Sequence, residues 1–134
     1  MNRTTIVSAL LVGLIFGCSS LKINDPMDAF DKANRAYRHA VSWSEYEVAA
    51  TFLKNGDEEK VEEQIEHLNQ FRVTAYELRT LTVVEEGVRV RQVVKISYFK
   101  KDDMVVKTMA DDQLWEYDPE LHTWQLVTGL PKLK

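Results

Sequence analysis

Hydrophobic and polar positions divide the chain into three parts with different patterns. Residues 6–16 are almost all apolar, whereas residues 26–69 repeat apolar side chains at helical spacing. Residues 70–128 are rich in β-branched and aromatic residues, with polar turn residues between the apolar runs. This order predicts a short apolar leader, then a helical half, and then a sheet half.

The helical half begins at Asp25-Pro26, because Asp can cap a helix and Pro suits its first position. Apolar residues then recur at helical spacing from Met27 to Val41, which predicts a first amphipathic helix that ends near Val41. Ser44, with Glu47 three residues later, fits a capping box. The capping box predicts that a second, short helix follows the first.

Residues 46–52 also alternate between apolar and polar positions, so a strand is the alternative for this segment. Asn55-Gly56 is a C-terminal stop signal and, together with the capping box, it favours the helix. Asp57 then opens a third helix, which has a narrow apolar stripe and a strongly acidic opposite side. We expect that acidic side to be a solvated helix face.

The sheet half predicts four strands joined by short turns, a pattern typical of an antiparallel meander. The strands are expected at residues 71–84, 88–100, 104–117 and 122–128. On the face that we assign to the helices, a three-residue first turn predicts the pairs Val84–Val88, Leu78–Val94 and Tyr76–Ile96. Glu77 then faces Lys95 on the other side of the sheet, as an ion pair of modest strength.

The two tryptophans of the last hairpin are expected to pack against each other. A four-residue third turn places Trp115 opposite Trp124, and aromatic cross-strand pairs stabilise hairpins. The interpretation that we favour is packing at the end of the core. The alternative is a small apolar pocket, lined by Trp115, Trp124, Tyr76 and Tyr98.

The second face of the sheet is more apolar than a half-solvated sheet requires. By alternation, this face carries four apolar and two basic residues: Val73, Val93, Phe99, Leu81, Arg89 and Arg91. An apolar patch with a basic rim predicts a contact with another protein or with a second copy of the chain. The alternative is a set of scattered apolar residues on a twisted sheet, with no functional role.

The leader has Arg3 before its apolar run and ends at the lone cysteine, as an export signal does. Ile15-Phe16-Gly17-Cys18 resembles the lipobox of bacterial lipoproteins. The resemblance implies a lipid on the Cys18 sulfur, cleavage before Cys18 and acylation of the new amino group. Several acyl chains hold a protein firmly at a membrane. Because Ser19 and not aspartate follows the cysteine, we expect the periplasmic face of the outer membrane.

Four segments of the chain are therefore expected. They are a signal peptide (1–17), the lipidated Cys18 with a short tether (18–25), one domain (26–131) and a tail (132–134). The net charge of −4 gives no support for nucleic-acid binding. Once lipidated, the single cysteine leaves no thiol for a disulfide or a metal. The histidines form no metal motif, so we expect neither a metal nor a cofactor.

The sequence also resembles small Gram-negative lipoproteins that carry an NTF2-like (cystatin-like) domain. The resemblance lies in Tyr46-Glu47-Val48-Ala49-Ala50, Gln113-Leu114-Trp115-Glu116-Tyr117, Trp124-Gln125-Leu126 and Leu130-Pro131. It implies an α+β fold, with three N-terminal helices packed on a curled four-stranded antiparallel meander sheet, a reduced NTF2-like cone. Domains of this fold include enzymes, ligand binders and dimeric adaptors, so the function stays open.

We expect a lipid-anchored, non-catalytic interaction module that belongs to a cell-envelope complex. The alternative is a carrier of a small apolar ligand in the cone. NTF2-like enzymes place acids and tyrosines in the cone, and Tyr46, Tyr76, Tyr98 and Asp111 are candidates for that region. No catalytic motif maps onto them, so we do not expect an enzyme. Asp111-Asp112 is interpreted as an irregularity within the third strand.

Overall fold

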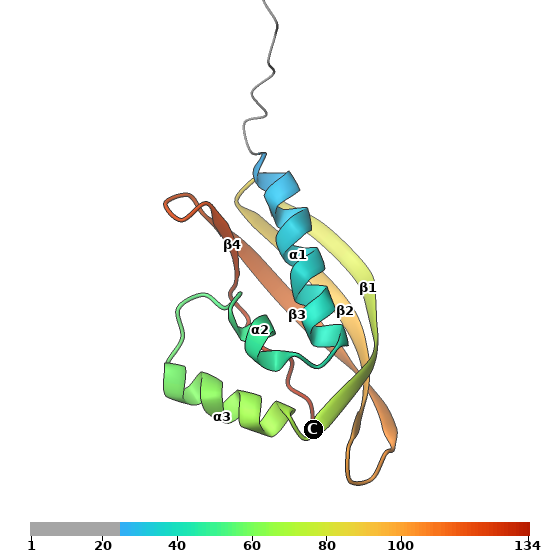
Figure 1. Ribbon diagram of the computed structural model, residues 1–134. Coiled ribbons are helices and arrows are strands. Elements are labelled where there is room, and N and C mark those ends of the chain that lie inside the picture. Colours follow the sequence, from blue (N-terminus) through green and yellow to red (C-terminus); the bar gives the residue numbers. More distant parts are fainter. Residues whose placement is uncertain (1–24) are drawn as a thin grey trace, which may run out of the picture.

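The computed structural model describes residues 25–134, so the predicted signal peptide, Cys18 and the predicted tether before Asp25 lie outside the described residues. In the described part, three helices precede a four-stranded sheet (Figure 1). The strand order is β1-β2-β3-β4, and all neighbouring strands are antiparallel. The predicted α+β class and the meander are therefore confirmed. The sheet curls behind α1 and does not close into a barrel.

The first helix, α1 (Pro26–Ser42), has the predicted N-terminal cap. The Asp25 Oδ1 atom accepts a hydrogen bond from the Met27 N–H at 3.0 Å, and Pro26 occupies the first helical turn. One side of the helix is buried, at Phe30, Tyr37, Ala40 and Val41. This apolar side packs against the sheet, because burying it removes the helix's largest apolar surface from water.

The second helix, α2 (Tyr46–Ala50), is short, so the helix prediction is confirmed over the strand alternative. The predicted Ser44 cap is wrong, since Glu45 occupies the cap position and makes no side-chain cap bond. Ser44 instead has a positive φ of 57°. In this turn its Oγ accepts a hydrogen bond from the Val73 N–H at 3.0 Å. The hydroxyl therefore covers the edge of the sheet and does not cap the helix.

The third helix, α3 (Glu58–Leu68), begins after Asp57, whose Oδ1 accepts a hydrogen bond from the Glu59 N–H at 3.2 Å. Only its last residue, Leu68, is fully buried. The glutamates of its acidic side are all exposed, as the sequence predicts for a solvated helix face. The helix leads directly into the first strand.

The strands lie within one or two residues of the predicted ranges at most of their ends. They are β1 (Phe71–Glu85), β2 (Arg89–Lys100), β3 (Val106–Asp118) and β4 (Thr123–Leu126). Three predicted pairings are confirmed in the register, namely Tyr76–Ile96, Leu78–Val94 and Glu77–Lys95. The predicted ion pair of Glu77 with Lys95 is wrong, because the Glu77 carboxylate pairs with Arg79 at 3.2 Å instead. Periodicity and turn length thus predict the register in the middle of the first hairpin.

The alternation along β1 breaks at three places. The register shifts between Val73 and Ala75, between Leu78 and Thr80, and between Val83 and Glu85. Each shift adds an unpaired residue, which bends the strand and increases its twist. The predicted Val84–Val88 pair is therefore wrong, and Glu85 pairs with Arg89 instead. The three shifts account for the curl of the sheet.

Two further predictions about register are wrong. The pairing of β2 with β3 runs without interruption through Asp111 and Asp112, so this dipeptide is not an irregularity. In the last hairpin Trp124 pairs with Tyr117, and Trp115 pairs with Leu126. The Asp118 Oδ1 atom accepts hydrogen bonds from two N–H groups of the turn, which closes the hairpin one residue later than expected.

The last residues of the chain belong to the core. Leu133, in the segment predicted to be a tail, is 1% exposed, and its carbonyl oxygen lies 2.9 Å from His67 Nε2. The predicted tail is therefore wrong, because Leu133 supplies apolar surface between α3 and the sheet. The chain after α2 covers the edge of β4, where the Leu126 N–H donates to the Phe52 carbonyl at 2.7 Å.

Candidate functional site

A group of polar side chains lies in the centre of the core, between α1 and the inner face of the sheet. Gln92 of β2 and Gln113 of β3 are paired in the register and are buried. Asp111, two residues before Gln113, and Tyr76 of β1 lie beside them and are also buried. We call Gln92, Gln113, Asp111 and Tyr76 the polar cluster.

Gln113 holds the polar cluster together with both ends of its amide. Its Nε2 donates hydrogen bonds to Asp111 Oδ2 at 2.8 Å and to Tyr76 OH at 3.1 Å. Its Oε1 accepts from Gln92 Nε2 at 2.6 Å and from Trp115 Nε1 at 3.3 Å. Because buried polar atoms need partners, this network explains why the cluster is tolerated inside an apolar core.

α1 is bound to the polar cluster through Asn34, whose Oδ1 accepts a hydrogen bond from Gln92 Nε2 at 2.8 Å. Two other buried atoms at this site, Gln92 Oε1 and Tyr37 OH, have no partner in the described part of the chain. Tyr37 is completely buried. The site thus retains hydrogen-bonding capacity that its own side chains do not use.

The pKa values of the site follow from burial. Burial raises the pKa of the Asp111 carboxyl, the hydrogen bond from Gln113 lowers it in part, and the nearby Asp112 carboxylate raises it further. Burial likewise raises the pKa of Tyr76 to about 12, and it raises the pKa of Tyr37 well above its ordinary value. Both phenols therefore stay protonated at neutral pH. They can hold a polar group by hydrogen bonding, but they cannot act as general bases.

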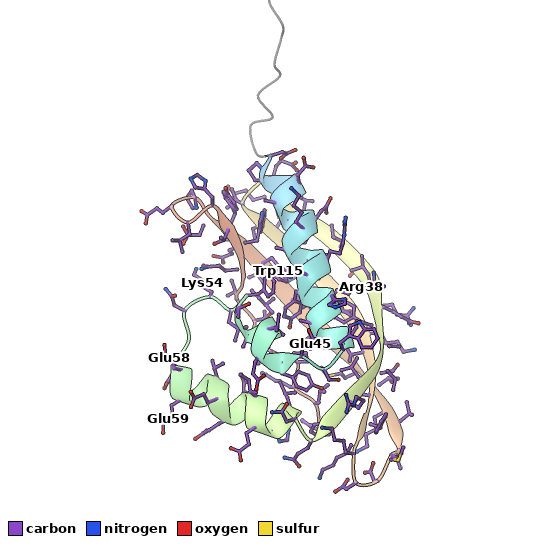
Figure 2. All side chains as sticks on the ribbon, in the orientation of Figure 1. Arg38, Glu45, Lys54, Glu58, Glu59 and Trp115 are labelled. Atoms are coloured by element: carbon purple, nitrogen blue, oxygen red, sulfur yellow. The ribbon has the colours of Figure 1, made fainter. Side chains whose placement is uncertain are left out.

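Aromatic rings fill the space beside the polar cluster. The Trp115 ring lies beneath α1 (Figure 2), with its centroid 6.0 Å from that of Phe30, 5.3 Å from Tyr37 and 6.2 Å from Phe52. All three contacts have the edge-to-face geometry that aromatic pairs prefer. Trp115 is 0% exposed. The interior at this point is packed with side chains.

The four residues of the predicted pocket separate into two places. Tyr76 and Trp115 both contact Gln113 and lie at the centre. Trp124 packs on Phe30, with ring centroids 5.1 Å apart, and its Nε1 donates to the Pro26 carbonyl at 2.6 Å. It therefore packs close to the central group, through the Phe30 ring.

Tyr98 lies away from this group, at the end of the sheet where the chain ends. Its ring packs on Phe71 with centroids 5.7 Å apart, and its OH lies 3.3 Å from the Lys134 carbonyl oxygen. Tyr46, a candidate of the enzyme alternative, donates its hydroxyl to the Phe71 carbonyl at 2.9 Å. Among the four enzyme candidates, the structure thus brings together only Tyr76 and Asp111, through Gln113.

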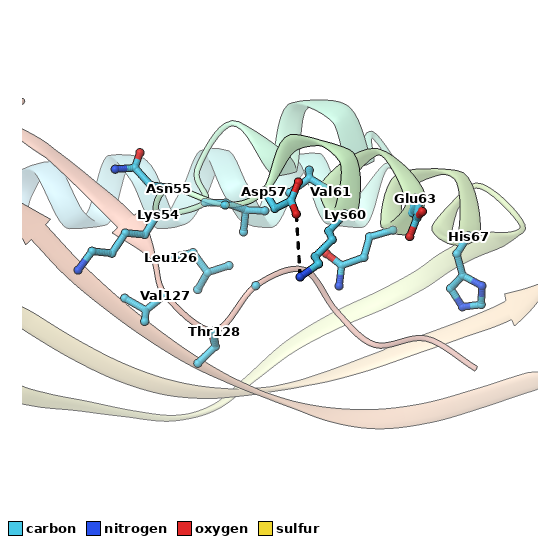
Figure 3. A pocket seen from close by; sticks show the side chains of 14 residues that line it. Lys54, Asn55, Asp57, Lys60, Val61, Glu63, His67, Leu126, Val127 and Thr128 are labelled. Atoms are coloured by element: carbon cyan, nitrogen blue, oxygen red, sulfur yellow. Dashed lines mark ion pairs between the residues drawn. The ribbon is translucent and has the colours of Figure 1, made fainter.

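An open groove lies elsewhere, between α3 and the chain that follows β4 (Figure 3). It has a volume of about 770 Å³ and is open to solvent. Its floor includes Val61 and Leu126, and Lys60 forms an ion pair of 3.9 Å with Asp57 at its rim. None of the predicted pocket residues lines this groove. Trp124 alone among them lines a smaller one of about 280 Å³.

The outer face of the sheet carries four of the six residues of the predicted interface. Val93 and Phe99 lie there and are half-buried. Arg91 Nε lies 3.5 Å from Asp112 Oδ1, and Arg89 Nε lies 3.6 Å from a carboxylate oxygen of β3. The predicted basic rim is therefore present, but each arginine already has an acidic neighbour.

The other two apolar residues of the predicted interface lie on the inner face, so their assignment to the outer face is wrong. Val73 pairs with Tyr98 and is 6% exposed within the core. Leu81 pairs with Gln92 of the polar cluster. The register shifts in β1 are the reason, because each one reverses the alternation that places a residue on one face.

A stripe of the inner face is left open. Leu78, Leu81 and Val83 lie on this face but are 49%, 43% and 39% exposed. Their partners in β2 are buried under α1, which covers the middle of the sheet and leaves the outer half of β1 open (Figure 1). We call Leu78, Leu81 and Val83 the β1 ledge. It is an unpartnered apolar surface within residues 25–134.

Sequence reasoning missed the two glutamines of the polar cluster. Gln92 stands between Val90 and Val94 in the apolar alternation of β2, and Gln113 stands between Asp111 and Trp115 in β3. A polar residue at a core position of a strand was the available signal. This signal indicates a polar cluster only when the two strands are paired, because the pairing places the two amides side by side.

Two searches of residues 25–134 give negative results. This part of the chain contains no group of three or more His, Cys, Asp or Glu side chains placed to bind a metal ion. It also contains no helix that is both long and apolar enough to cross a membrane.

Helices on one side of a curled, open, antiparallel sheet are shared with several solved structures. A ketosteroid isomerase-like protein from Erwinia carotovora atroseptica aligns at 14% identity with a TM-score of 0.57, over 78% of this chain and 92% of its own. The protein has an NTF2-like fold. An NTF2-like protein of unknown function from Shewanella oneidensis aligns at 11% identity with a TM-score of 0.53, over 76% of this chain and 94% of its own.

A conserved protein from Planctomyces limnophilus has the same arrangement, at 13% identity with a TM-score of 0.52, over 75% of this chain and 90% of its own. No protein-family model matches the sequence, and no curated protein compared with it matches either. At these identities the likeness concerns the NTF2-like fold alone. The function must therefore be argued from the chain's own residues.

Proposed function

We propose that the protein is a lipid-anchored, non-catalytic interaction module of the cell envelope. In this proposal Cys18 holds it at the periplasmic face of the outer membrane, and the β1 ledge binds a protein partner. The observation that carries the proposal is the ledge itself. It consists of three neighbouring aliphatic side chains that are each about half exposed. They lie on the face of the sheet that otherwise forms the core.

The state of the interior supports a non-catalytic role. The Asp111 carboxyl is buried and hydrogen-bonded to Gln113, and the phenols of Tyr76 and Tyr37 have raised pKa values. Trp115 and its neighbouring rings occupy the space that a substrate would need. The acid and the phenols of this buried site are therefore not accessible to a substrate as general bases.

The position of the anchor favours a partner close to the membrane. Six residues lie between Cys18 and Asp25, and the seven steps of chain that join the two span at most about 25 Å. Pro26 packs beside Gly87 in the turn between β1 and β2, since a Cβ built on Gly87 would lie 3.6 Å from the Pro26 Cβ. The ledge runs toward this turn, so its Val83 end lies near the tether.

The test is a crosslinking pull-down of the full-length lipoprotein from intact envelopes, with identification of partners by mass spectrometry. Leu78→Asp combined with Leu81→Asp should remove the partner, because two charges would replace the centre of the ledge. Val48→Asp is the matched control, since Val48 on α2 is also 49% exposed. A partner that survives in the double variant would refute the proposal, and so would the absence of any partner of the wild type.

A second candidate is a carrier of a small ligand inside the cone. It is favoured by one observation, the two buried atoms without partners, Tyr37 OH and Gln92 Oε1. A ligand bound there would need a polar group as well as apolar surface. Native mass spectrometry of protein released from envelopes tests this candidate. A bound small molecule that is lost in Tyr37→Phe would support it, and a wild-type protein of unaltered mass would exclude it.

A further inference from the structure

The outer edge of β1 is open over most of its length. At its start, the Tyr46 hydroxyl donates to the Phe71 carbonyl, and Ser44 Oγ accepts the Val73 N–H. Beyond Val73, no other strand described here pairs with this edge, because β1 is the last strand of the sheet. The opposite edge differs, since the Phe52 carbonyl and the Lys54 N–H both bond to Leu126 of β4.

The open edge, residues 74–85, carries only some of the features that usually protect such edges. It contains no proline and no lysine, which are the residues that most often prevent a further strand from adding to a sheet. Its protective features are the charged Glu77, Arg79 and Glu85 and the three shifts in register along β1. The aliphatic residues of the ledge belong to this same stretch.

The charged side chains on this edge would complement those of a second copy of the same strand. Glu77 and Arg79 flank Leu78 on each side, are 55% and 53% exposed at their side chains, and lie 3.2 Å apart. If two copies of the strand pair antiparallel with Leu78 opposite Leu78, Glu77 of each copy faces Arg79 of the other. The same arrangement places an apolar residue against an apolar residue at the centre.

We propose that the edge of β1 binds a second copy of this chain in a two-fold dimer, with Leu78 at the symmetry axis. The inference rests on the proposed function and adds a second contact, at the strand edge that borders the ledge. A two-fold axis repeats each contact, so that one Glu77–Arg79 contact between copies implies two. The two ledges then form one continuous apolar surface on the inner side of the joined sheets.

The extra residue at the Leu78–Thr80 shift limits the length of the paired segment. We therefore expect a weak dimer in dilute solution and a stronger one at a membrane, where anchoring of both copies raises their effective concentration. For this reason the test uses the full-length lipoprotein, purified in detergent and also reconstituted in vesicles of phosphatidylethanolamine and phosphatidylglycerol. The readout is the fraction of dimer after crosslinking and by analytical ultracentrifugation.

The variants reverse one charge at a time. In a dimer of the Glu77→Arg variant, positions 77 and 79 of each copy both carry arginine, so both contacts between the copies become repulsive. In a dimer of the Arg79→Glu variant both positions carry glutamate, and both contacts are again repulsive. Each variant alone should weaken the dimer by roughly tenfold or more. When the two variants are mixed, both contacts become attractive again, and a mixed dimer should form. Glu63→Arg makes the same charge change on the exposed side of α3 and should have no effect.

Recovery in the mixture separates a contact between copies from a folding defect, because a misfolded variant would not be rescued by a second variant. A wild type that is monomeric in vesicles, or single variants that still form homodimers, would overturn the dimer. If no dimer forms but the Leu78→Asp/Leu81→Asp variant still loses a different protein partner, the proposed function is retained. If the dimer forms and no other envelope protein is captured, the dimer stands and the role in an envelope complex fails.

Discussion

Gln92 Nε2 lies 2.6 Å from Gln113 Oε1, across β2 and β3 in the centre of the core. Two amides thus occupy positions that the alternation of these strands reserves for apolar side chains. The arrangement is stable only while every member of the polar cluster keeps its partners.

Gln113→Leu is expected to lower the free energy of unfolding by about 2–4 kcal/mol. The substitution keeps a similar volume but removes the hydrogen-bond partners of Asp111 and Trp115. Urea unfolding followed by tryptophan fluorescence measures the change. Gln64→Leu on the exposed side of α3 is the control, with an expected change within about 0.5 kcal/mol. A loss below about 1 kcal/mol for Gln113→Leu would show that the network adds little.

Asp111 should make stability depend on pH in acid. Its pKa is raised in the folded protein above the ordinary value of 3.8 that applies in the unfolded chain. Between these two values the folded state binds more protons, so the contribution of Asp111 to stability falls as the pH rises. Asp111→Asn removes this titration and keeps an acceptor for Gln113. The variant should therefore gain stability relative to the wild type as the pH rises above about 3.8, and a difference that is flat with pH would argue against a raised pKa.

Phe30→Ala should be among the most destabilising single substitutions, by about 3–5 kcal/mol. The Phe30 ring contacts both Trp115 and Trp124 and is 1% exposed. Its removal would leave a cavity under the start of α1. Leu121→Ala, at a residue that is 63% exposed, should change stability by less than about 0.5 kcal/mol. Thermal unfolding of the three proteins at one scan rate checks the order.

Gly87 should tolerate asparagine better than valine, because its φ of 68° suits only residues that accept the left-handed region. Gly87→Val is expected to lower stability by about 1–2 kcal/mol, and Gly87→Asn by less than about 1 kcal/mol. An added Cβ would lie 3.6 Å from Pro26, an ordinary contact, so backbone strain is the expected cause. Equal losses for both variants would instead indicate a steric cause.

The elements of the fold could be predicted because their signals are local. The Asp25 cap, the helical spacing up to Val41 and the turn at Gly87 each involve a few neighbouring residues. The register of Tyr76 with Ile96 follows from one turn length. The shifts in β1 could not be predicted, because an extra residue in a strand has no side-chain signature. One shift was enough to move Val73 from the expected outer face into the core.

The candidate site could be predicted less well than the fold. Tyr76 and Trp115 were expected at a pocket and do lie together, although Trp115 and its aromatic neighbours fill the space. The polar cluster was not predicted as a group, because Gln92 and Gln113 become neighbours only when their strands pair. The β1 ledge depends on where α1 crosses the sheet. That position is set by tertiary packing, which no single stretch of sequence encodes.

The most direct test of the proposed function is a photo-crosslinking amino acid placed at Leu81 of the full-length protein in intact envelopes. The ledge should yield a discrete adduct with another envelope protein or with a second copy of the chain. The same amino acid at Val48, which is similarly exposed, should yield none. No adduct at Leu81, or equal adducts at both positions, would contradict the assignment of the ledge as the binding surface.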